Sequence, residues 1–312
     1  GSGNTFYLVE TTDEQEFDWV KLAIWLCDKN NEGGADGLLI VCPSTVADAK
    51  MRVINADGSE ASMCGNGLRC VARYVCEKLQ VNEALIETMK ANLKVKKEQP
   101  LFNELPTYAV EISPVSFALS SLPMCYKNKE VLLNEVIEEF SPTIQFTAVS
   151  VPNPHLIGIV NDYYIKHQSH QFLLAQYLNS ENEYCADGVN VSYVYPMTDD
   201  SIYVRTYERG VGFTNACGTA MTASALVAKL NGIVQSDVVT VYNPGGFVKC
   251  VVNKVNDVYK LQLIGNATIK EIYSLEVSES GFQWMHCEST GEQVEYEECI
   301  NFVEQQTNPY LK

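Results

Sequence analysis

Residues 51–67 read MRVINADGSEASMCGNG, and residues 202–219 read IYVRTYERGVGFTNACGT. Each stretch opens with a short apolar run that is typical of a strand and continues into a polar loop. In each, a Cys-Gly pair comes nine residues after the polar residue that ends the run, at Cys64 and at Cys217, and a helical pattern follows. Two matching strand, loop, Cys-Gly and helix units predict a duplicated domain, the alternative being a chance likeness of two short segments.

The composition is that of a folded globular protein. The chain has 312 residues, of which 46% are hydrophobic and 20% charged, which suits one large domain or two moderate ones. Its net charge of -17 repels phosphate backbones and anionic lipids, so we expect neither nucleic acid nor a membrane as a partner. No long apolar stretch and no signal-peptide pattern occurs, which predicts a cytoplasmic location. The 11 cysteines lack CxxC pairs, which predicts free thiols and no metal site.

Hydrophobic periodicity predicts the same order of elements twice along the chain. In the first part we expect strands at 6–9, 38–41 and 51–54, a helix over 18–30 ended by Gly33-Gly34, a helix after Cys64, and strands between 86 and 112. In the second part we expect strands at 147–151, 189–195 and 202–207, a helix over 171–178, a helix after Cys217, and strands between 238 and 264. The helix after Cys217 has small residues on every side, which predicts that it is enclosed all round.

The two cysteines are expected at helix N-termini. A helix N-terminus carries roughly half a positive charge and free N–H groups, so it lowers the pKa of a thiol and can hold a carboxylate. For either segment alone, a buried and inert cysteine is the alternative. Two thiols that face one cleft would suit a two-base reaction, in which one thiolate removes a proton from a carbon and the other thiol protonates the opposite face. No dinucleotide or pyridoxal phosphate motif is present, so no cofactor is expected.

Several segments resemble the signature segments of diaminopimelate epimerase, in the same order. The main ones are Asn55–Ser59, Met63–Gly67, Asn153–His155, Gly188–Val191, Glu208–Gly212 and Ala216–Thr219, joined by Gly3-Asn4, Gly34–Gly37 and Pro244–Gly246. The resemblance extends from about residue 1 to residue 274. It implies an isomerase that interconverts LL-2,6-diaminopimelate and meso-diaminopimelate without pyridoxal phosphate, in lysine and peptidoglycan precursor synthesis, and that forms a homodimer.

The resemblance also implies the architecture. We expect an α+β fold of two pseudo-symmetric domains, each a β-barrel-like, mostly antiparallel sheet around a central helix. The first domain is expected over residues 1–114, with the chain returning to it at about 265–312. The second is expected over residues 115–264.

The resemblance assigns roles to individual residues. Cys64 and Cys217 match the acid/base cysteines, and His155 and Glu208 match the pair that tunes and orients the reacting groups. The residues that match the substrate-binding set are Asn4, Asn55, Gly65, Asn66, Asn153, Asn190, Arg209, Gly218 and Thr219. Each has an ordinary alternative: a turn or cap for an asparagine, a structural imidazole for His155, and a surface ion pair for Arg209.

Some positions depart from the family pattern. Phe213 stands where a glutamate is usual, Gly37 stands where a substrate-binding glutamine is common, and Asn215 and Ala220 also differ. In the tail over 275–312, which has eight glutamates, we recognise no counterpart of the family pattern, and one interpretation is a surface appendage. The alternative functions are a racemase or epimerase of proline, hydroxyproline or histidine on the same fold, a non-catalytic amino-acid-binding protein, and a redox sensor.

Overall fold

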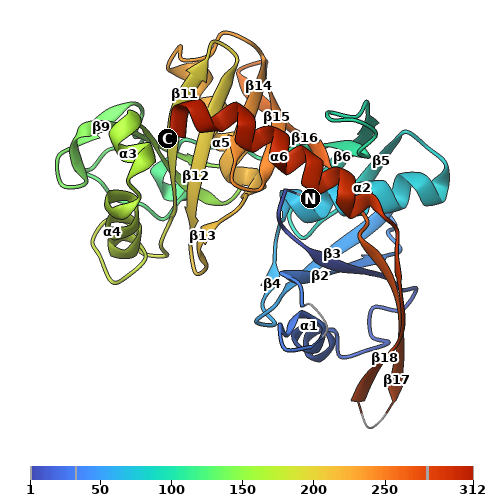
Figure 1. The fold of residues 1–312 in the computed structure, drawn as a ribbon. Coiled ribbons are helices and arrows are strands. Elements are labelled where there is room, and N and C mark those ends of the chain that lie inside the picture. The colour runs from blue at the N-terminus through green and yellow to red at the C-terminus, as the bar shows by residue number, and fades with distance from the viewer. Residues whose placement is uncertain (1, 32–33, 279–280, 312) are drawn as a thin grey trace. The chain divides into compact units, whose positions relative to one another are not determined.

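The computed structural model describes residues 2–31, 34–278 and 281–311, and it divides into two compact units (Figure 1). Unit 1 comprises Gly3–Val110 and Gly265–Asn301, and unit 2 comprises Ser2, Glu111–Ile264 and the chain from Phe302 onward. The mixed α+β class expected from the sequence is confirmed. Residues 302–311, which we expected with the first half, lie in unit 2 because the Phe302 ring contacts Phe247 and Leu311 packs on the core of that unit.

Unit 1 is built on a mostly antiparallel sheet. Its strands are β1 (Phe6–Glu10), β2 (Gly37–Cys42), β3 (Ala49–Asn55), β4 (Glu60–Ala61), β5 (Glu83–Glu87), β6 (Asn92–Glu98) and β7 (Thr107–Ile112). They follow the order β1-β2-β3-β5-β6-β7, with β4 beside β3. Two helices, α1 (Trp19–Cys27) and α2 (Gly65–Leu79), accompany the sheet, and α2 contacts β1, β2, β3, β5 and β6.

Unit 2 has a larger sheet. Its strands are β8 (Glu135–Ile137), β9 (Ser141–Ser150), β10 (Pro154–Ile159), β11 (Asn190–Thr198), β12 (Ser201–Glu208), β13 (Gly212–Thr214), β14 (Val238–Asn243), β15 (Gly246–Val255) and β16 (Val258–Asn266). They follow the order β16-β15-β14-β12-β11-β10-β9-β8, with β13 beside β12. The helices are η1 (Leu119–Ser121), α3 (Asp162–Lys166), α4 (Ser169–Leu178) and α5 (Gly218–Leu230).

The two units repeat one topology. In unit 1, β1 pairs parallel to β2, β2 antiparallel to β3 and β3 parallel to β5, and β5, β6 and β7 continue antiparallel. In unit 2, β10 to β12 and β14 to β16 repeat these orientations one for one. The short strands β4 and β13, and then the helices α2 and α5, stand at equivalent places. The two quoted stretches of sequence are therefore β3-β4-α2 and β12-β13-α5.

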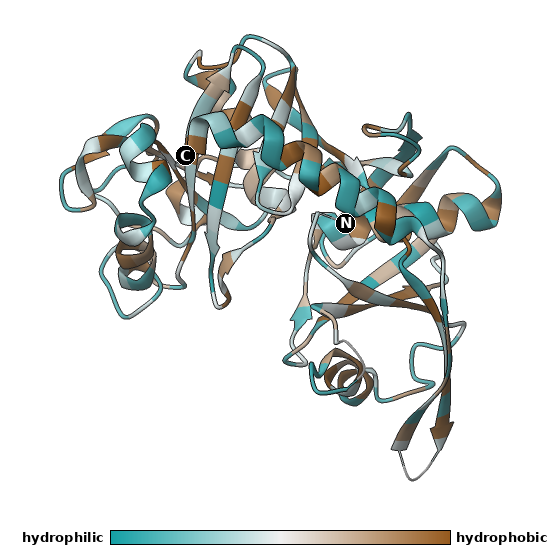
Figure 2. Cartoon of the chain, viewed as in Figure 1, coloured by the Kyte–Doolittle hydropathy of each residue, from teal (hydrophilic) through white to brown (hydrophobic). Residues whose placement is uncertain are grey.

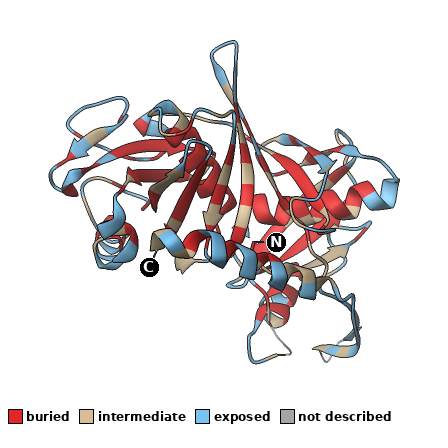
Figure 3. Ribbon diagram, turned by 45° about the horizontal axis from the view of Figure 1, so that its top comes forward, coloured by how far each residue is buried: buried red, intermediate tan, exposed pale blue. Residues whose placement is uncertain are grey.

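The two repeated helices are buried to different extents. In α5 every residue from Gly218 to Ala228 is buried, which confirms the enclosed helix expected from its small side chains. Strands β9, β10, β11, β12, β14 and β15 contact it. Helix α2 is more amphipathic, because Leu68, Val71, Ala72 and Val75 are buried while Leu79 is 46% exposed. Figure 3 shows buried residues concentrated in the strands and in these helices.

The expected elements in the first 31 residues differ in one detail. Helix α1 ends at Cys27, with Asp28 as its C-cap, and so does not continue to residue 30. Gly33, which we expected to help end this helix, lies outside the described residues, and Gly34 has a φ of 58°. The expected strands at 38–41 and 51–54 correspond to β2 and β3.

The tail after residue 270 is not an appendage. Strands β17 (Glu271–Ser278) and β18 (Gly281–Ser289) form a hairpin whose Trp284 packs against Trp25 of α1 and Tyr7 of β1, at ring-centroid distances of 5.1 and 5.6 Å. Helix α6 (Glu292–Leu311) follows and alternates hydrophilic and hydrophobic residues (Figure 2). Its buried side chains include Cys299 and Val303.

We expect overpacking of α5 to destabilise the protein. Ala223 is fully buried in the enclosed helix, so Ala223→Leu would force neighbouring strands apart and lower the free energy of unfolding by about 1–3 kcal/mol. Urea denaturation followed by circular dichroism measures this change. The control is Ala118→Leu at an exposed position, and equal stabilities of the two variants would contradict the enclosed packing.

Candidate functional site

The first half of the site lies at the start of α2 in unit 1. Cys64 is the N-cap of this helix, and its sulfur accepts a hydrogen bond from the Gly67 N–H at 3.3 Å. A side chain at Gly67 would require the buried Leu39 side chain to shift, because its Cβ would lie 2.8 Å from Leu39 Cδ2. The glycine therefore brings the backbone close to both the sulfur and the sheet, and the N-terminal location expected for Cys64 is confirmed.

Two of the expected substrate-binding asparagines contact each other beside Cys64. The Asn66 side chain is 2% exposed, and its Nδ2 donates to Asn4 Oδ1. Asp36 holds this pair, because its Oδ2 accepts from Asn4 Nδ2 at 3.1 Å and from the Thr5 N–H at 2.9 Å. No role was predicted for Asp36, although it lies within the segment Gly34–Gly37 that resembles the family.

Asn55 and Gly37 lie across from each other on β3 and β2. The Asn55 side chain donates to Ser59 Oγ at 2.9 Å, which is the turn contact that we named as the alternative for such residues. At Gly37 an added Cβ would lie 2.7 Å from the Ile54 carbonyl oxygen. The backbone here leaves no room for the glutamine that is common in the family.

The second half of the site lies at the start of α5 in unit 2. Cys217 is the N-cap, and its sulfur lies 3.4 Å from Thr219 Oγ1. We expected a lowered thiol pKa here, and that prediction is wrong. Burial, together with the nearby Glu208 charge, raises the pKa of Cys217 well above its usual value, and outweighs the opposite effects of Thr219 and the Ala220 N–H. In this state Cys217 is a protonated thiol that hydrogen-bonds a carboxylate.

Glu208 is held by the hairpin of β12 and β13. The Thr214 hydroxyl donates to Glu208 Oε1 at 2.5 Å, and Glu208 also hydrogen-bonds the Cys217 thiol. Phe213 replaces the usual glutamate with an aromatic contact, because its ring lies 5.3 Å from Tyr207 and 6.4 Å from Phe172 of α4. We gave no role to Thr214. Its place six residues after Glu208, across a tight hairpin, is the signal that could have identified it.

His155, another expected site residue of unit 2, lies on strand β10. It lies on β10 opposite Asn190 of β11, is completely buried, and neither ring nitrogen has a hydrogen-bond partner in the protein. Burial, and the nearby charge of Arg209, lower the pKa of His155 to about 3. The imidazole is therefore neutral at physiological pH, with an unpaired nitrogen lone pair.

Asn190 links the start of β10 to the backbone of Arg209. Its Nδ2 donates to the Pro154 carbonyl at 3.1 Å, and its Oδ1 accepts from the Arg209 N–H at 2.8 Å. The exposed Arg209 side chain is steadied by one hydrogen bond from Nη1 to the Asp187 carbonyl, at 2.9 Å. Asn153 is half-buried in the bend before β10. Unit 2 thus brings together His155, Asn190, Glu208, Arg209 and Cys217, whereas Asn4, Asn55, Cys64 and Asn66 belong to unit 1.

Two cavities of unit 2 are lined by none of the expected site residues. One of about 850 Å³ is lined by the loop from Ala118 to Glu130, with Glu139 and Tyr184, and contains no expected site residue. The other, of about 620 Å³, is lined by Tyr177, Tyr207 and Val211, among others. All 11 cysteines are free thiols. Within residues 2–31, 34–278 and 281–311, no three His, Cys, Asp or Glu side chains gather as metal ligands, and no helix is long and apolar enough to span a membrane.

Comparison with known proteins adds a family and close relatives. The family profile described as diaminopimelate epimerase matches residues 1–102 and 147–269. A diaminopimelate epimerase of Listeria innocua is 49% identical over 315 residues, which is 98% of this chain and 95% of the relative. That of Enterococcus faecalis is 44% identical over 319 residues, covering 98% and 97%.

Two solved structures are similar in fold. A Bacillus anthracis phenazine biosynthesis protein of the PhzF family has a TM-score of 0.58 at 15% identity, covering 85% of this chain and 91% of its own. A hydroxyproline epimerase of Agrobacterium vitis has a TM-score of 0.55 at 14% identity, covering 85% and 87%. At such low identities these likenesses show the fold alone.

The buried His155 should not titrate near neutral pH. With a pKa of about 3, against 6.5 for an ordinary histidine, its imidazole stays neutral between pH 5 and 8. Because only the unfolded chain takes up this proton, its contribution to stability is complete above about pH 6.5 and declines as the pH falls toward 3. Histidine ¹⁵N NMR measures the titration, and His155→Gln assigns the signal. A His155 midpoint near 6.5 would disprove the buried, uncharged state.

Proposed function

The chain belongs to the diaminopimelate epimerase family, and we propose that Cys64 and Cys217 interconvert LL-2,6-diaminopimelate and meso-diaminopimelate from opposite faces of one α-carbon. The enzyme is thus an isomerase that acts on a small molecule. The observation that carries the proposal is the repeated placement of a cysteine as the N-cap of α2 and of α5, each after an equivalent strand pair. A chance likeness of two short segments would not extend to a whole repeated sheet topology.

The reaction needs one base and one acid. One cysteine, as a thiolate, takes the proton of the α-carbon, and the C–H electron pair remains on the carbon. The other cysteine gives its S–H proton to the opposite face of the same carbon, which inverts the centre. Because burial and Glu208 raise the pKa of Cys217, this cysteine acts directly as the acid. To act as the base it must first transfer its proton, for which the hydrogen-bonded Glu208 carboxylate is an acceptor.

The helix N-termini stabilise the carbanion. The first N–H groups of a helix have no acceptor within the helix, and Gly65-Asn66 and Gly218-Thr219 supply such groups beside the two sulfurs. Negative charge that moves onto the reacting carboxylate is stabilised by these donors, each worth about 3 kcal/mol by comparison with oxyanion-hole donors. The exposed guanidinium of Arg209 suits the carboxylate of the distal amino-acid centre. Asn4, Asn55, Asn153 and Asn190 complete the proposed binding set.

The wider properties of the enzyme follow from the family. We propose that it works without pyridoxal phosphate, as a homodimer in the cytoplasm, in the synthesis of lysine and of peptidoglycan precursors. The proposed halves are residues 1–114, with the chain returning at about 265, and residues 115–264. His155, which is neutral and has unpaired ring nitrogens, is proposed to tune and orient the reacting groups.

Loss of either thiol should stop epimerisation. Cys64→Ala and Cys217→Ala each leave one face of the carbon without its proton partner, so we expect kcat/KM to fall by about 10²–10⁴-fold or more. Proton NMR of LL-diaminopimelate in D₂O follows both loss of the α-proton and appearance of the meso isomer. The control is Cys125→Ala, an exposed cysteine of unit 2, with unchanged activity. Full stereochemical turnover by either active-site variant would refute the two-base mechanism.

Arg209 should determine selectivity for the distal centre. A site built around hydrogen bonds discriminates against an analogue that leaves them unmet, so we expect LL-diaminopimelate to be preferred over lysine by about 10⁴ in kcat/KM. Arg209→Lys loses the planar fork and should lose much of this preference. The comparison is kcat/KM for both substrates on both proteins, with Arg52→Lys as the control. If lysine, proline or histidine reacts within tenfold of diaminopimelate on the natural protein, the substrate is wrong and the broader racemase function replaces it.

A further inference from the structure

We propose that the first part of α6, up to Asn301, belongs to the catalytic scaffold of unit 1, where Glu292 and Tyr296 position the residues around Cys64. The inference rests on the proposed function, because it assigns these two residues to the binding and orientation of the same substrate. The matched family region ends at residue 269, so the tail lies beyond it.

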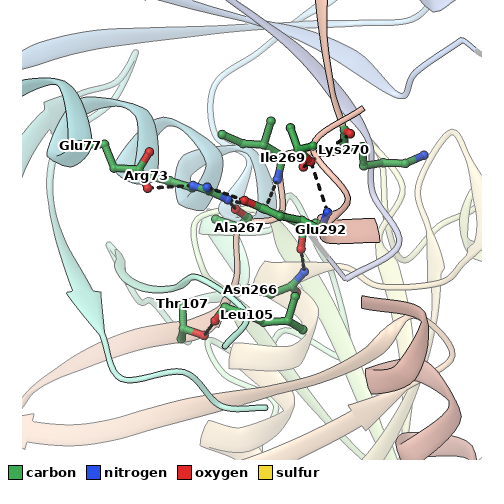
Figure 4. Close-up of polar contacts among 11 residues, drawn as sticks. Arg73, Glu77, Leu105, Thr107, Asn266, Ala267, Ile269, Lys270 and Glu292 are labelled. Carbon is green, nitrogen blue, oxygen red and sulfur yellow. Dashed lines mark hydrogen bonds and ion pairs between the residues drawn. The ribbon is translucent and has the colours of Figure 1, made fainter. Parts of the chain in front are cut away.

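The first contact joins the tail to the helix that carries Cys64. Arg73 of α2 is only 8% exposed, and its Nη1 and Nη2 donate to the two carboxylate oxygens of Glu292, both at 2.7 Å (Figure 4). The same guanidinium donates to the Ala267 carbonyl at 2.8 Å and to Glu77 at 3.0 Å. Glu292 also accepts from the Ile269 N–H at 2.8 Å. A bidentate, partly buried pair of this kind fixes direction as well as distance.

The charge state of Glu292 agrees with this geometry. Burial alone would raise its pKa, but the hydrogen bonds from Arg73 and the Ile269 N–H outweigh burial and lower it. The carboxylate is therefore ionised near neutral pH, and its ion pair with the Arg73 guanidinium of α2 is maintained.

The second contact joins the tail to the asparagine pair. The Gly3 N–H hydrogen-bonds the Tyr296 phenol oxygen. Gly3 precedes Asn4, whose side chain accepts from Asn66, the second residue of α2. Tyr296 thus holds the backbone that presents Asn4 to Asn66. Burial raises the pKa of Tyr296 to about 12, so the phenol is neutral.

Both contacts come from one face of α6. Residues four apart on a helix are neighbours on its surface, and Glu292 and Tyr296 have this spacing. This face of α6 therefore holds α2 through Arg73, which lies nine residues after Cys64. The same face holds the Gly3-Asn4 segment, whose Asn4 side chain contacts the first turn of α2. A displacement of about 1 Å at a reacting group can cost about 10²-fold in rate, so fixing both parts has a direct catalytic consequence.

The test uses two conservative variants in the full-length protein. Tyr296→Phe removes only the hydroxyl that holds Gly3, and we expect KM for LL-diaminopimelate to rise about fivefold with kcat within about twofold. Glu292→Gln keeps the shape but removes the charge opposite Arg73, and we expect kcat to fall about tenfold as Cys64 loses its fixed orientation. The matched controls on the same helix are Tyr310→Phe and the exposed Glu304→Gln, with unchanged kinetics.

A melting temperature measured on each variant separates positioning from simple stabilisation. A merely structural contact would lower the melting temperature and leave KM and kcat of the folded protein unchanged, and that result would overturn the inference. If the natural protein fails to epimerise diaminopimelate, the proposed function fails first. If the natural protein is active and Tyr296→Phe and Glu292→Gln match their controls in both KM and kcat, only the role of the tail is refuted.

Discussion

The structure depends on placing a cysteine at the first turn of a helix that is fixed by close packing. Free N–H groups at a helix start are useful to a substrate only if the helix is fixed, and α5 is fixed because strands contact it on several sides and its residues from Gly218 to Ala228 are buried. Such enclosure requires small side chains, since interiors are close-packed. The small alanine, serine and threonine side chains after Cys217 therefore allow the strands to enclose α5, and this enclosure fixes the position of the Cys217 thiol.

The repeated topology does not give the two thiols the same surroundings. Cys64 accepts a hydrogen bond from the Gly67 N–H, whereas Cys217 is more deeply buried and meets the carboxylate of Glu208. A backbone donor favours a thiolate, and burial beside a negative charge favours a thiol. One fold used twice can thus surround its two cysteines differently, because Glu208 in unit 2 stands where unit 1 has Asn55, nine residues before the cysteine. Thr214, by holding one oxygen of Glu208, orients the group that makes the difference in unit 2.

The sequence predicted what local pattern determines. Periodicity identified β3, β12 and the enclosure of α5, and the Cys-Gly pairs located both N-caps. It could not predict the pKa of Cys217, because burial arises from strands distant in sequence and outweighs the helix terminus. Nor could it predict that Asn55 contacts Ser59 within a turn, whereas Asn66 contacts Asn4 across 62 residues of chain. Asparagine has the same local preferences in both roles, and only the tertiary contacts separate them.

The tail shows how a charged segment can be misjudged from composition. Eight glutamates after residue 274 suggest a solvated surface, yet a single one of them, Glu292, forms the bidentate pair with Arg73. The same guanidinium also donates to the Ala267 carbonyl and to Glu77, and Glu292 accepts from the Ile269 N–H. A buried arginine without its carboxylate would destabilise α2, because an unpaired charge is costly to bury. Arg73 on the helix of Cys64 and Glu292 in the tail therefore depend on each other, which ties the part of the tail up to Asn301 to the unit that holds Cys64.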